Sequence, residues 1–174
     1  MATPQQQPSK EFAAAYRDLM VQSLTNEMQT TKKVLAAVPD DKYDYKPDPK
    51  ARTAGELAWH IATVDVQFAE EIAEGKFSMD PRYKDQPQTS AELADWYEKN
   101  FTRGLAKLRA MTPEQLVRVL NFYDIMNMPA YFYLSFIEKH SIHHRGQLAA
   151  YLRPMGSKVP SIYGGSADEE WKAA

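Results

Sequence analysis

Apolar residues recur every three or four positions through four long segments, a spacing that places them on one face of an α-helix. The pattern predicts helices over about residues 9–38, 53–75, 89–111 and 129–153. In the first segment the expected core face comprises Phe12, Tyr16, Leu19, Met20, Met28, Thr31 and Leu35. Each helix therefore needs a partner to cover its apolar stripe.

Start and stop signals support two of these helices. Thr53 is followed three residues later by Glu56, and Thr89 by Glu92, which is the spacing of a capping box. Gly75 is a typical residue for the end of the second helix. We therefore expect both helices to begin at these threonines.

The connections are less regular. Pro113, just after Thr112, predicts a short extra helix that ends near Leu120. Residues 121–128 are expected to be irregular or weakly extended, because no segment shows a convincing two-residue alternation. Residues 76–88 form a long connection that contains two prolines and is expected to cross an end or a side of the molecule.

Four long helices with one long crossover predict an all-α four-helix bundle with one short extra helix. A chain of 174 residues suits a single domain over residues 1–174. Residues 1–8 are expected to be a flexible N-terminus and residues 157–174 a C-terminal tail.

Composition excludes several classes of function. The net charge is −2, from 21 basic and 23 acidic residues, and the sequence has no long run of like charges. This pattern argues against a nucleic-acid surface or a polybasic membrane surface. No stretch approaches the roughly 18 apolar residues of a membrane span, so we expect a cytoplasmic protein. There is no cysteine, so a metal would be held by imidazole, carboxylate or water.

Three of the four histidines are candidate metal ligands. His140 and His144 lie one helical turn apart on an apolar face, and His60 lies on the stripe of the second predicted helix. If the two helices pack face to face, His60, His140 and His144 form a three-ligand site with an open position. Hydrogen bonds among neutral imidazoles are the alternative. His143 is turned about 100° from His144 and is expected off the metal.

Other side chains are weaker candidates. The hydroxyls of Tyr133 and Tyr151 are near enough on the same helix to serve the site, although packing is the favoured role for both. Arg145 is a candidate for holding a substrate carboxylate. Ser141 follows His140, so the glutamate of a metalloprotease-type H-E-x-x-H motif is absent.

Three blocks resemble those of one family. The run HSIHHRGQLAAYLRPMG at residues 140–156 resembles the last-helix signature of the DinB-like (YfiT-like) metal-dependent enzymes, and TAGELAWHIA at residues 53–62 resembles the second-helix signature. Residues 159–169 are similar to a C-terminal block of that family. The resemblance implies an up-down-down-up bundle, often a homodimer, with a divalent metal on His60, His140 and His144. Zinc or nickel is the leading metal, with iron and manganese as alternatives.

The resemblance also bears on function. Known activities in the family include thiol S-transfer, so the leading hypothesis is a metal-dependent enzyme that joins a low-molecular-weight thiol to a small electrophile. Hydrolysis by metal-bound water is a second possibility, although no general base is evident beside the histidine pair. The alternative from another class is a non-catalytic metal- or ligand-binding dimeric bundle, such as a stress-related module. A third reading is a bundle whose histidines are purely structural.

Overall fold

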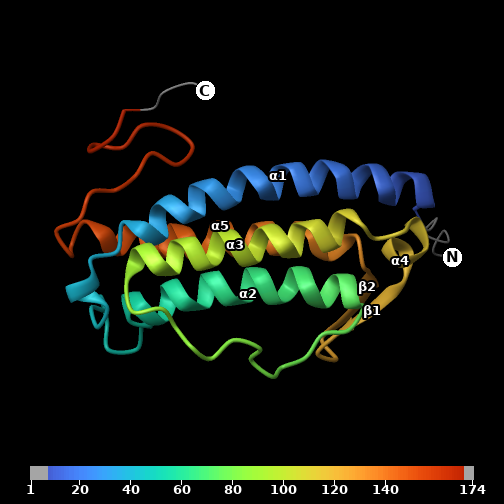
Figure 1. Ribbon diagram of the computed structural model, residues 1–174, viewed down its shortest axis with the longest axis horizontal. Coiled ribbons are helices and arrows are strands. Elements are labelled where there is room, and N and C mark those ends of the chain that lie inside the picture. Colours follow the sequence, from blue (N-terminus) through green and yellow to red (C-terminus); the bar gives the residue numbers. More distant parts are fainter. Residues whose placement is uncertain (1–7, 171–174) are drawn as a thin grey trace, which may run out of the picture.

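The computed structural model describes residues 8–170 (Figure 1). Its long helices are α1 (Lys10–Ala36), α2 (Ala54–Glu74), α3 (Ser90–Arg109) and α5 (Phe132–Leu152). The shorter elements are the 3₁₀ helix η1 (Asp40–Lys42), the helix α4 (Pro113–Val117) and the strands β1 (Val119–Phe122) and β2 (Met126–Pro129). The all-α bundle predicted from the sequence is confirmed, with one small addition of sheet.

The helices begin where the capping signals predict. The Thr53 hydroxyl accepts the backbone N–H of Glu56, and the Glu56 carboxylate accepts the backbone N–H of Thr53. The same reciprocal pair opens α3 at Thr89. At the other end of α2, Gly75 has φ +81°, a left-handed conformation that costs glycine nothing. A β-carbon there would also collide with the Arg118 guanidinium.

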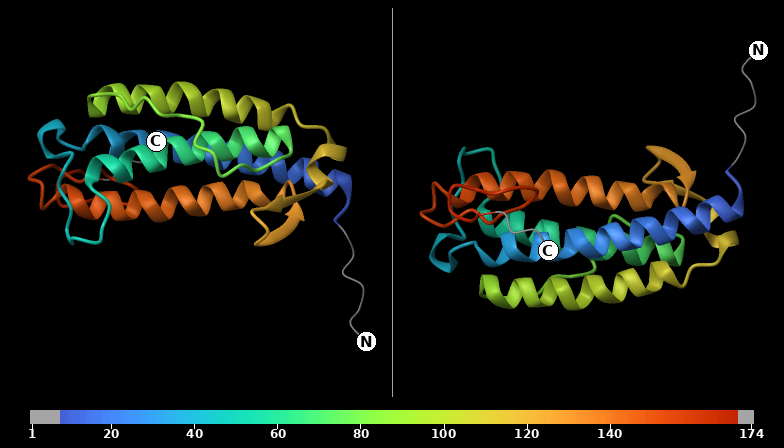
Figure 2. Two further views of the ribbon diagram at one scale, coloured as in Figure 1. Left: turned by 90° about the horizontal axis from the view of Figure 1, so that it is seen from below. Right: turned by 90° about the horizontal axis from the view of Figure 1, so that it is seen from above.

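The four long helices run up, down, down and up, as predicted (Figure 1). Figure 2 shows α2 between α3 and α5 from one side and α1 between the same two helices from the other. Because α2 and α3 run parallel, residues 76–89 must return along the full length of the bundle to connect them. This crossover lies alongside α2.

The predicted core face of α1 is wrong at two positions. Phe12 and Leu19 are 51% and 66% exposed, whereas Leu24 and Val34 are completely buried. The apolar residues of α1 cover more than one face, so the spacing alone does not show which face meets α3 and α5. The packing rotates α1 so that Phe12 stacks on Tyr16 at the surface.

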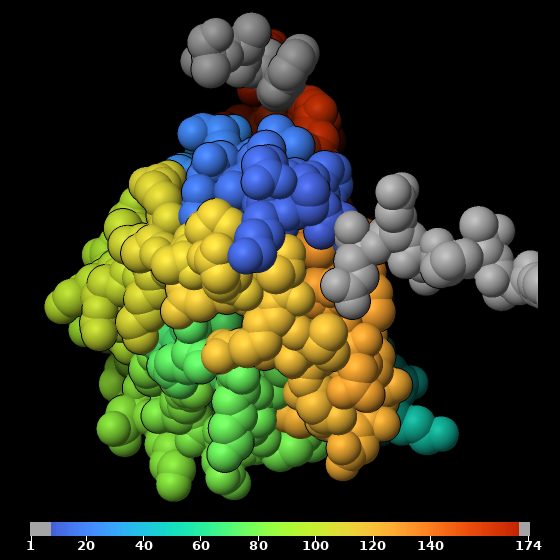
Figure 3. All heavy atoms as spheres, turned by 90° about the vertical axis from the view of Figure 1, so that its right-hand side faces the viewer, coloured from blue at the N-terminus to red at the C-terminus, as the bar shows by residue number. Residues whose placement is uncertain are grey.

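A β-hairpin follows α4, where an irregular segment was expected. The short helix ends at Val117 rather than near Leu120, and β1 pairs with β2 in antiparallel register. Tyr123 and Asp124 form the turn with positive φ angles of 53° and 58°. Four-residue strands are too short for a two-residue period to stand out. In Figure 3 α4 and the hairpin cover this end of the bundle between α1 and α2.

The termini are described only in part. Residues 1–7 and 171–174 lie outside the described residues, so most of the predicted flexible N-terminus is untested. Residues 157–170 of the predicted tail form an ordered loop beside the ends of α1 and α5. Between residues 8 and 170, no helix combines the length and apolar character needed to cross a membrane.

Candidate metal centre

Three imidazoles from two helices meet on the side of the bundle where α2 packs against α5. The Nε2 atom of His60 lies 3.2 Å from Nε2 of His140 and 3.3 Å from Nε2 of His144. All three ligand atoms lie within 4.8 Å of one another. Nitrogens bound at about 2.0–2.1 Å to one tetrahedral zinc ion would be about 3.3–3.4 Å apart. The spacing of the three nitrogens therefore suits a shared cation.

Hydrogen bonds on the far side of two rings orient their lone pairs. His140 Nδ1 lies 3.1 Å from the Asp65 carboxylate, and His144 Nδ1 lies 2.6 Å from the Gln147 side-chain oxygen. An oxygen acceptor places the proton of a neutral imidazole on Nδ1, which leaves a lone pair on Nε2. Two such lone pairs point toward His60. A single proton on His60 Nε2 cannot serve both of them well, whereas one cation serves all three rings.

Burial keeps two of the rings neutral. It is the largest cause that lowers the pKa of His60 to about 3, and the neighbouring Arg52, His140 and His144 add to the effect. Burial also lowers the pKa of His144. Neutral imidazole is the form that binds metal, so these two rings need no deprotonation at neutral pH.

The histidines lie in the wall of an open cavity of about 730 Å³. α2 supplies one wall, which includes Trp59 and Phe68, and α5 supplies His140 and His144. The opposite side comes from the crossover and the hairpin, with Ser78, Met79, Pro81, Tyr83 and Tyr123. A small molecule in this space would contact the three imidazoles directly.

Comparison with known proteins assigns the family. The DinB family model matches residues 6–173. The chain belongs to the DinB family. Two Bacillus subtilis relatives, the uncharacterized proteins YjoA and YrdA, are each 30% identical to it. The YjoA match spans 83% of this chain and 94% of YjoA, and the YrdA match spans 88% and 91%.

Solved structures agree with this DinB assignment. A DinB-like protein from Bacillus cereus has a TM-score of 0.70 at 29% identity, over 83% of this chain and 95% of that one. The Bacillus subtilis YjoA structure has the same TM-score at 28% identity, over 83% and 97%. A DinB family member from Exiguobacterium sibiricum, at 19% identity over 84% and 95%, has a TM-score of 0.66 and shares the fold.

The three histidines that the sequence predicts as ligands cluster in the structure, and the fourth does not. His60, His140 and His144 come together, and their role as metal ligands stays a prediction. His143 is exposed and lies beside His144, with ring centroids 4.8 Å apart and its own nitrogens outside the cluster. His143 therefore lies outside the histidine cluster, in the direction that the helix period predicts.

Two further candidates have structural roles. The Tyr133 hydroxyl accepts the Met128 N–H and donates to the Leu120 carbonyl, so it anchors the hairpin. The Tyr151 ring packs against Tyr45. Neither hydroxyl takes part in the histidine cluster.

Arg145 is not at the cavity mouth. It is 1% exposed and pairs with the Glu27 carboxylate at 2.6 Å, on the side of α5 that faces α1. Arg52 is the arginine that lines the cavity. It directly precedes Thr53, the N-cap of α2, and therefore lies just before the helix that carries His60 begins.

Asp65 is the functional candidate that the sequence interpretation missed. It has no exposed surface, and its neighbours on α2 include the buried Ile61, Val66 and Ile72. A single acidic residue among apolar residues at helical spacing was the available signal, because an isolated buried carboxylate is costly without a partner.

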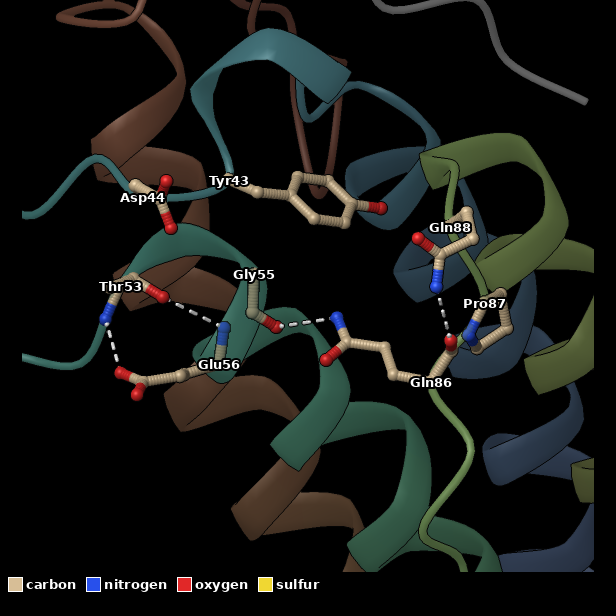
Figure 4. Close-up of a pocket in the computed structure, with 8 residues that line it drawn as sticks. All are labelled: Tyr43, Asp44, Thr53, Gly55, Glu56, Gln86, Pro87 and Gln88. Carbon is tan, nitrogen blue, oxygen red and sulfur yellow. Dashed lines mark hydrogen bonds between the residues drawn. The ribbon is translucent and has the colours of Figure 1, made fainter.

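A second, smaller hollow of about 310 Å³ lies where α2 begins (Figure 4). The Thr53–Glu56 capping box forms one edge, and Gln86 of the crossover donates to the Gly55 carbonyl at 3.3 Å. Tyr43 packs over Gly55, whose missing side chain makes room for the ring. These contacts tie the crossover to the start of the helix that carries His60.

Proposed function

We propose that this DinB protein is a metal-dependent enzyme that transfers a low-molecular-weight thiol to a small electrophile. The observation that carries the proposal is the meeting of three imidazole nitrogens in the wall of an open cavity. A closed site would have favoured a structural metal, because a catalytic metal keeps a position free for water or substrate. Zinc and nickel suit three neutral imidazoles, and iron and manganese are the alternatives.

Each part of this proposed reaction can be given to a group of the chain or to a co-substrate. His60, His140 and His144 would hold the ion, and the charge of the ion would lower the pKa of a thiol bound at the remaining coordination position, so that the sulfur would react as a thiolate. The thiol sulfur would form a bond to a carbon of the electrophile while the bond from that carbon to the leaving group breaks, and the thiol proton would pass to solvent or to the departing group. The chain has no cysteine, so the sulfur comes from a co-substrate.

The cavity offers groups that would orient such a co-substrate. Arg52 is exposed at the mouth and lies close enough to lower the pKa of His60 and of His144. Its guanidinium suits a carboxylate of the thiol. The apolar walls at Trp59 and Phe68 suit the body of the electrophile and keep water from it.

Metal content is the first test. The purified protein is expected to bind one zinc or nickel ion per chain after dialysis against that metal, measured by inductively coupled plasma mass spectrometry. His140→Ala and His144→Ala are expected to lose the ion. His143→Ala is the matched control, because it removes an exposed histidine of the same helix and leaves the cluster intact. Equal loss in all three variants, or no metal in the parent, contradicts the proposal.

Activity is the second test. Thiol–electrophile pairs and hydrolysable esters and amides are screened with the metal-loaded protein and with His60→Ala. Thiol consumption that needs both metal and His60 supports transfer. Ester or amide cleavage without thiol supports hydrolysis by metal-bound water instead. Metal binding with neither activity supports the rival function, a non-catalytic binding module.

We also propose that the protein is a homodimer, as the family resemblance implies. Phe12, Tyr16 and Leu19 form an exposed or half-exposed apolar stripe on α1, at spacings of four and three residues. A second copy of the chain would cover this stripe. Sedimentation equilibrium is expected to give twice the monomer mass of 19.9 kDa, and Leu19→Asp is expected to return it to one. A monomeric parent contradicts this proposal.

A further inference from the structure

A buried carboxylate touches the candidate metal centre from the inside of the bundle. Asp65 lies on α2, five residues after His60, and none of its surface reaches solvent. Its Oδ1 atom lies 3.1 Å from Nδ1 of His140, a residue of the facing helix α5. Asp65 therefore joins the two helices that carry the three imidazoles.

The other oxygen of this carboxylate is also occupied. Oδ2 accepts the hydroxyl of Tyr97, which is on α3 and is fully buried, at 3.1 Å. The side-chain hydroxyls of Thr31 and Ser141 lie beside the same phenol and are 3.2 Å apart. Three helices thus fix the position of the Asp65 carboxylate before any ligand enters the cavity.

The hydrogen bond gives Asp65 a definite effect on the ring. A carboxylate only accepts, so His140 must donate from Nδ1 and present its lone pair at Nε2. Nε2 is the atom that lies 3.2 Å from Nε2 of His60. Free histidine prefers the opposite tautomer, which would point an N–H at the other two rings. Without Asp65, the ring could also turn about its side-chain bonds.

Charge adds a second effect. Glu56 at the cavity rim and Arg52 at its mouth are both exposed, whereas Asp65 is fully buried and is bonded to one of the three histidines, His140. Three neutral imidazoles bring no negative charge to a divalent ion. A carboxylate one ring away offsets part of the ion's charge in a poorly solvated place. Its hydrogen bond to a ligand histidine also makes that histidine a better electron-pair donor to the ion.

We infer that Asp65 is a positioning residue of the site, which fixes the tautomer and the direction of His140, and that Tyr97 fixes Asp65. This inference rests on the proposed function for its metal, although the tautomer is a property of the metal-free chain. Partners of this kind contribute roughly tenfold to a hundredfold to metal affinity. Asp65 does not reach the cavity and touches no substrate.

The first experiment needs no metal. Long-range ¹H–¹⁵N NMR of the wild-type protein with a chelator, at a pH where the histidines are neutral, reports the tautomer of each ring. His140 is expected to carry its proton on Nδ1, whereas the exposed His143 is expected to show the ordinary preference for Nε2. A proton on Nε2 of His140 overturns the inference, even if the protein binds metal and is active.

The second experiment measures affinity. Zinc is titrated against a chromophoric chelator into wild type, Asp65→Asn and Thr31→Val. Asp65→Asn keeps the size of the side chain and removes its charge, and is expected to weaken zinc binding by at least tenfold. Thr31→Val alters the same buried network on the far side of Tyr97, further from His140, and is expected to leave zinc affinity within twofold. Equal affinities of Asp65→Asn and wild type overturn the inference.

A third variant decides the case in which Asp65→Asn does not fold. Tyr97→Phe removes only the hydroxyl that holds Oδ2, and is expected to weaken zinc binding by severalfold and to change the visible absorption of bound Co²⁺. An unchanged affinity together with an unchanged Co²⁺ spectrum overturns the role of the pair. If wild type binds neither Zn²⁺ nor Co²⁺, the proposed function fails, and the NMR result still decides the role of Asp65.

Discussion

Gly104 of α3 lies so close to Ala69 of α2 that a β-carbon at Gly104 would be 2.9 Å from the Ala69 β-carbon. α2 carries His60 and runs parallel to α3, so this contact sets how near α3 can approach the helix that supports the site. The absence of a side chain at Gly104 is what allows the approach.

Gly104→Ala is therefore expected to lower the free energy of unfolding by about 1–3 kcal/mol, because overpacking moves the two helices apart. Gly146→Ala is the matched control. Gly146 lies on α5 with nothing within 4 Å of an added β-carbon. That substitution is expected to raise stability by about 0.5–1 kcal/mol through helix propensity. Urea denaturation of both variants checks the pair, and equal effects would contradict the packing account.

The depressed pKa of His60 predicts a loss of stability in acid. The folded pKa is about 3 and the unfolded pKa about 6.5, so the unfolded chain binds more protons between these values. The stability from keeping this ring neutral is fully present above about pH 6.5 and is lost as the pH falls toward 3. The lowered pKa of His144 acts in the same direction.

Urea unfolding in the presence of a chelator, from pH 7.5 down to 4.5, measures this effect. The His60 contribution to the slope is at most about 1.4 kcal/mol per pH unit. His60→Asn is expected to flatten the pH dependence, whereas His143→Asn is expected to leave it as in wild type, because His143 is exposed. Parallel curves for wild type and His60→Asn would show that the ring does not titrate in this way.

The hydroxyl of Tyr133 connects α5 to both strands of the hairpin. It donates to the Leu120 carbonyl at 3.0 Å and accepts the Met128 N–H at 3.2 Å. Tyr133→Phe leaves these backbone groups without that partner and is expected to cost about 1–3 kcal/mol.

Hydrogen exchange separates this local effect from a global one. The amide of Met128 is expected to exchange faster in Tyr133→Phe, while amides in the middle of α2 change only by the loss of global stability. Tyr131→Phe is a suitable control, because the Tyr131 ring packs against Tyr16 and its hydroxyl is not bonded to the hairpin. Unchanged exchange at Met128 would contradict the anchoring role.

Arg145 and Glu27 form an ion pair between α5 and α1, with 1% and 14% of their side chains exposed. Tyr163 of the tail bonds to both: it accepts Arg145 Nη2 at 2.6 Å and donates to Glu27 at 2.7 Å. Arg145→Met leaves the Glu27 carboxylate without its positively charged partner and is expected to cost about 3–5 kcal/mol.

Arg153→Met is the comparison for this ion pair. Arg153 pairs with Asp168 of the same tail, but more than half of its side chain is exposed, so the loss is expected to be about 0–1 kcal/mol. Glu27→Gln in the Arg145→Met background is expected to restore part of the stability. Similar losses for Arg145→Met and Arg153→Met, measured by urea denaturation, would contradict the role of burial.

The sequence predicts what depends on local chemistry. The capping boxes at Thr53 and Thr89 and the left-handed Gly75 follow from residue types at fixed spacing, and the structure confirms them. The two histidines at i and i+4 share a face because the helix period requires it. These features need no knowledge of the rest of the fold.

Features that depend on packing between distant segments cannot be predicted from the local sequence in this way. The rotation of α1 that exposes Leu19 is decided by α3 and α5, and spacing along α1 alone leaves two faces possible. The contact between Asp65 and His140 joins residues 75 positions apart. Arg52 lines the cavity together with residues of the crossover, and no local pattern reveals that these segments meet.

The crossover of residues 76–89 also has a consequence for how this architecture can diversify. Parallel neighbouring helices oblige the chain to travel the length of the bundle, and the same stretch supplies Ser78, Met79, Pro81 and Tyr83 to the cavity. The imidazoles belong to helices, whereas these lining residues belong to a loop, and loops tolerate insertions and substitutions better than helices do. Substitutions in this connection can therefore reshape the cavity without displacing the three imidazoles.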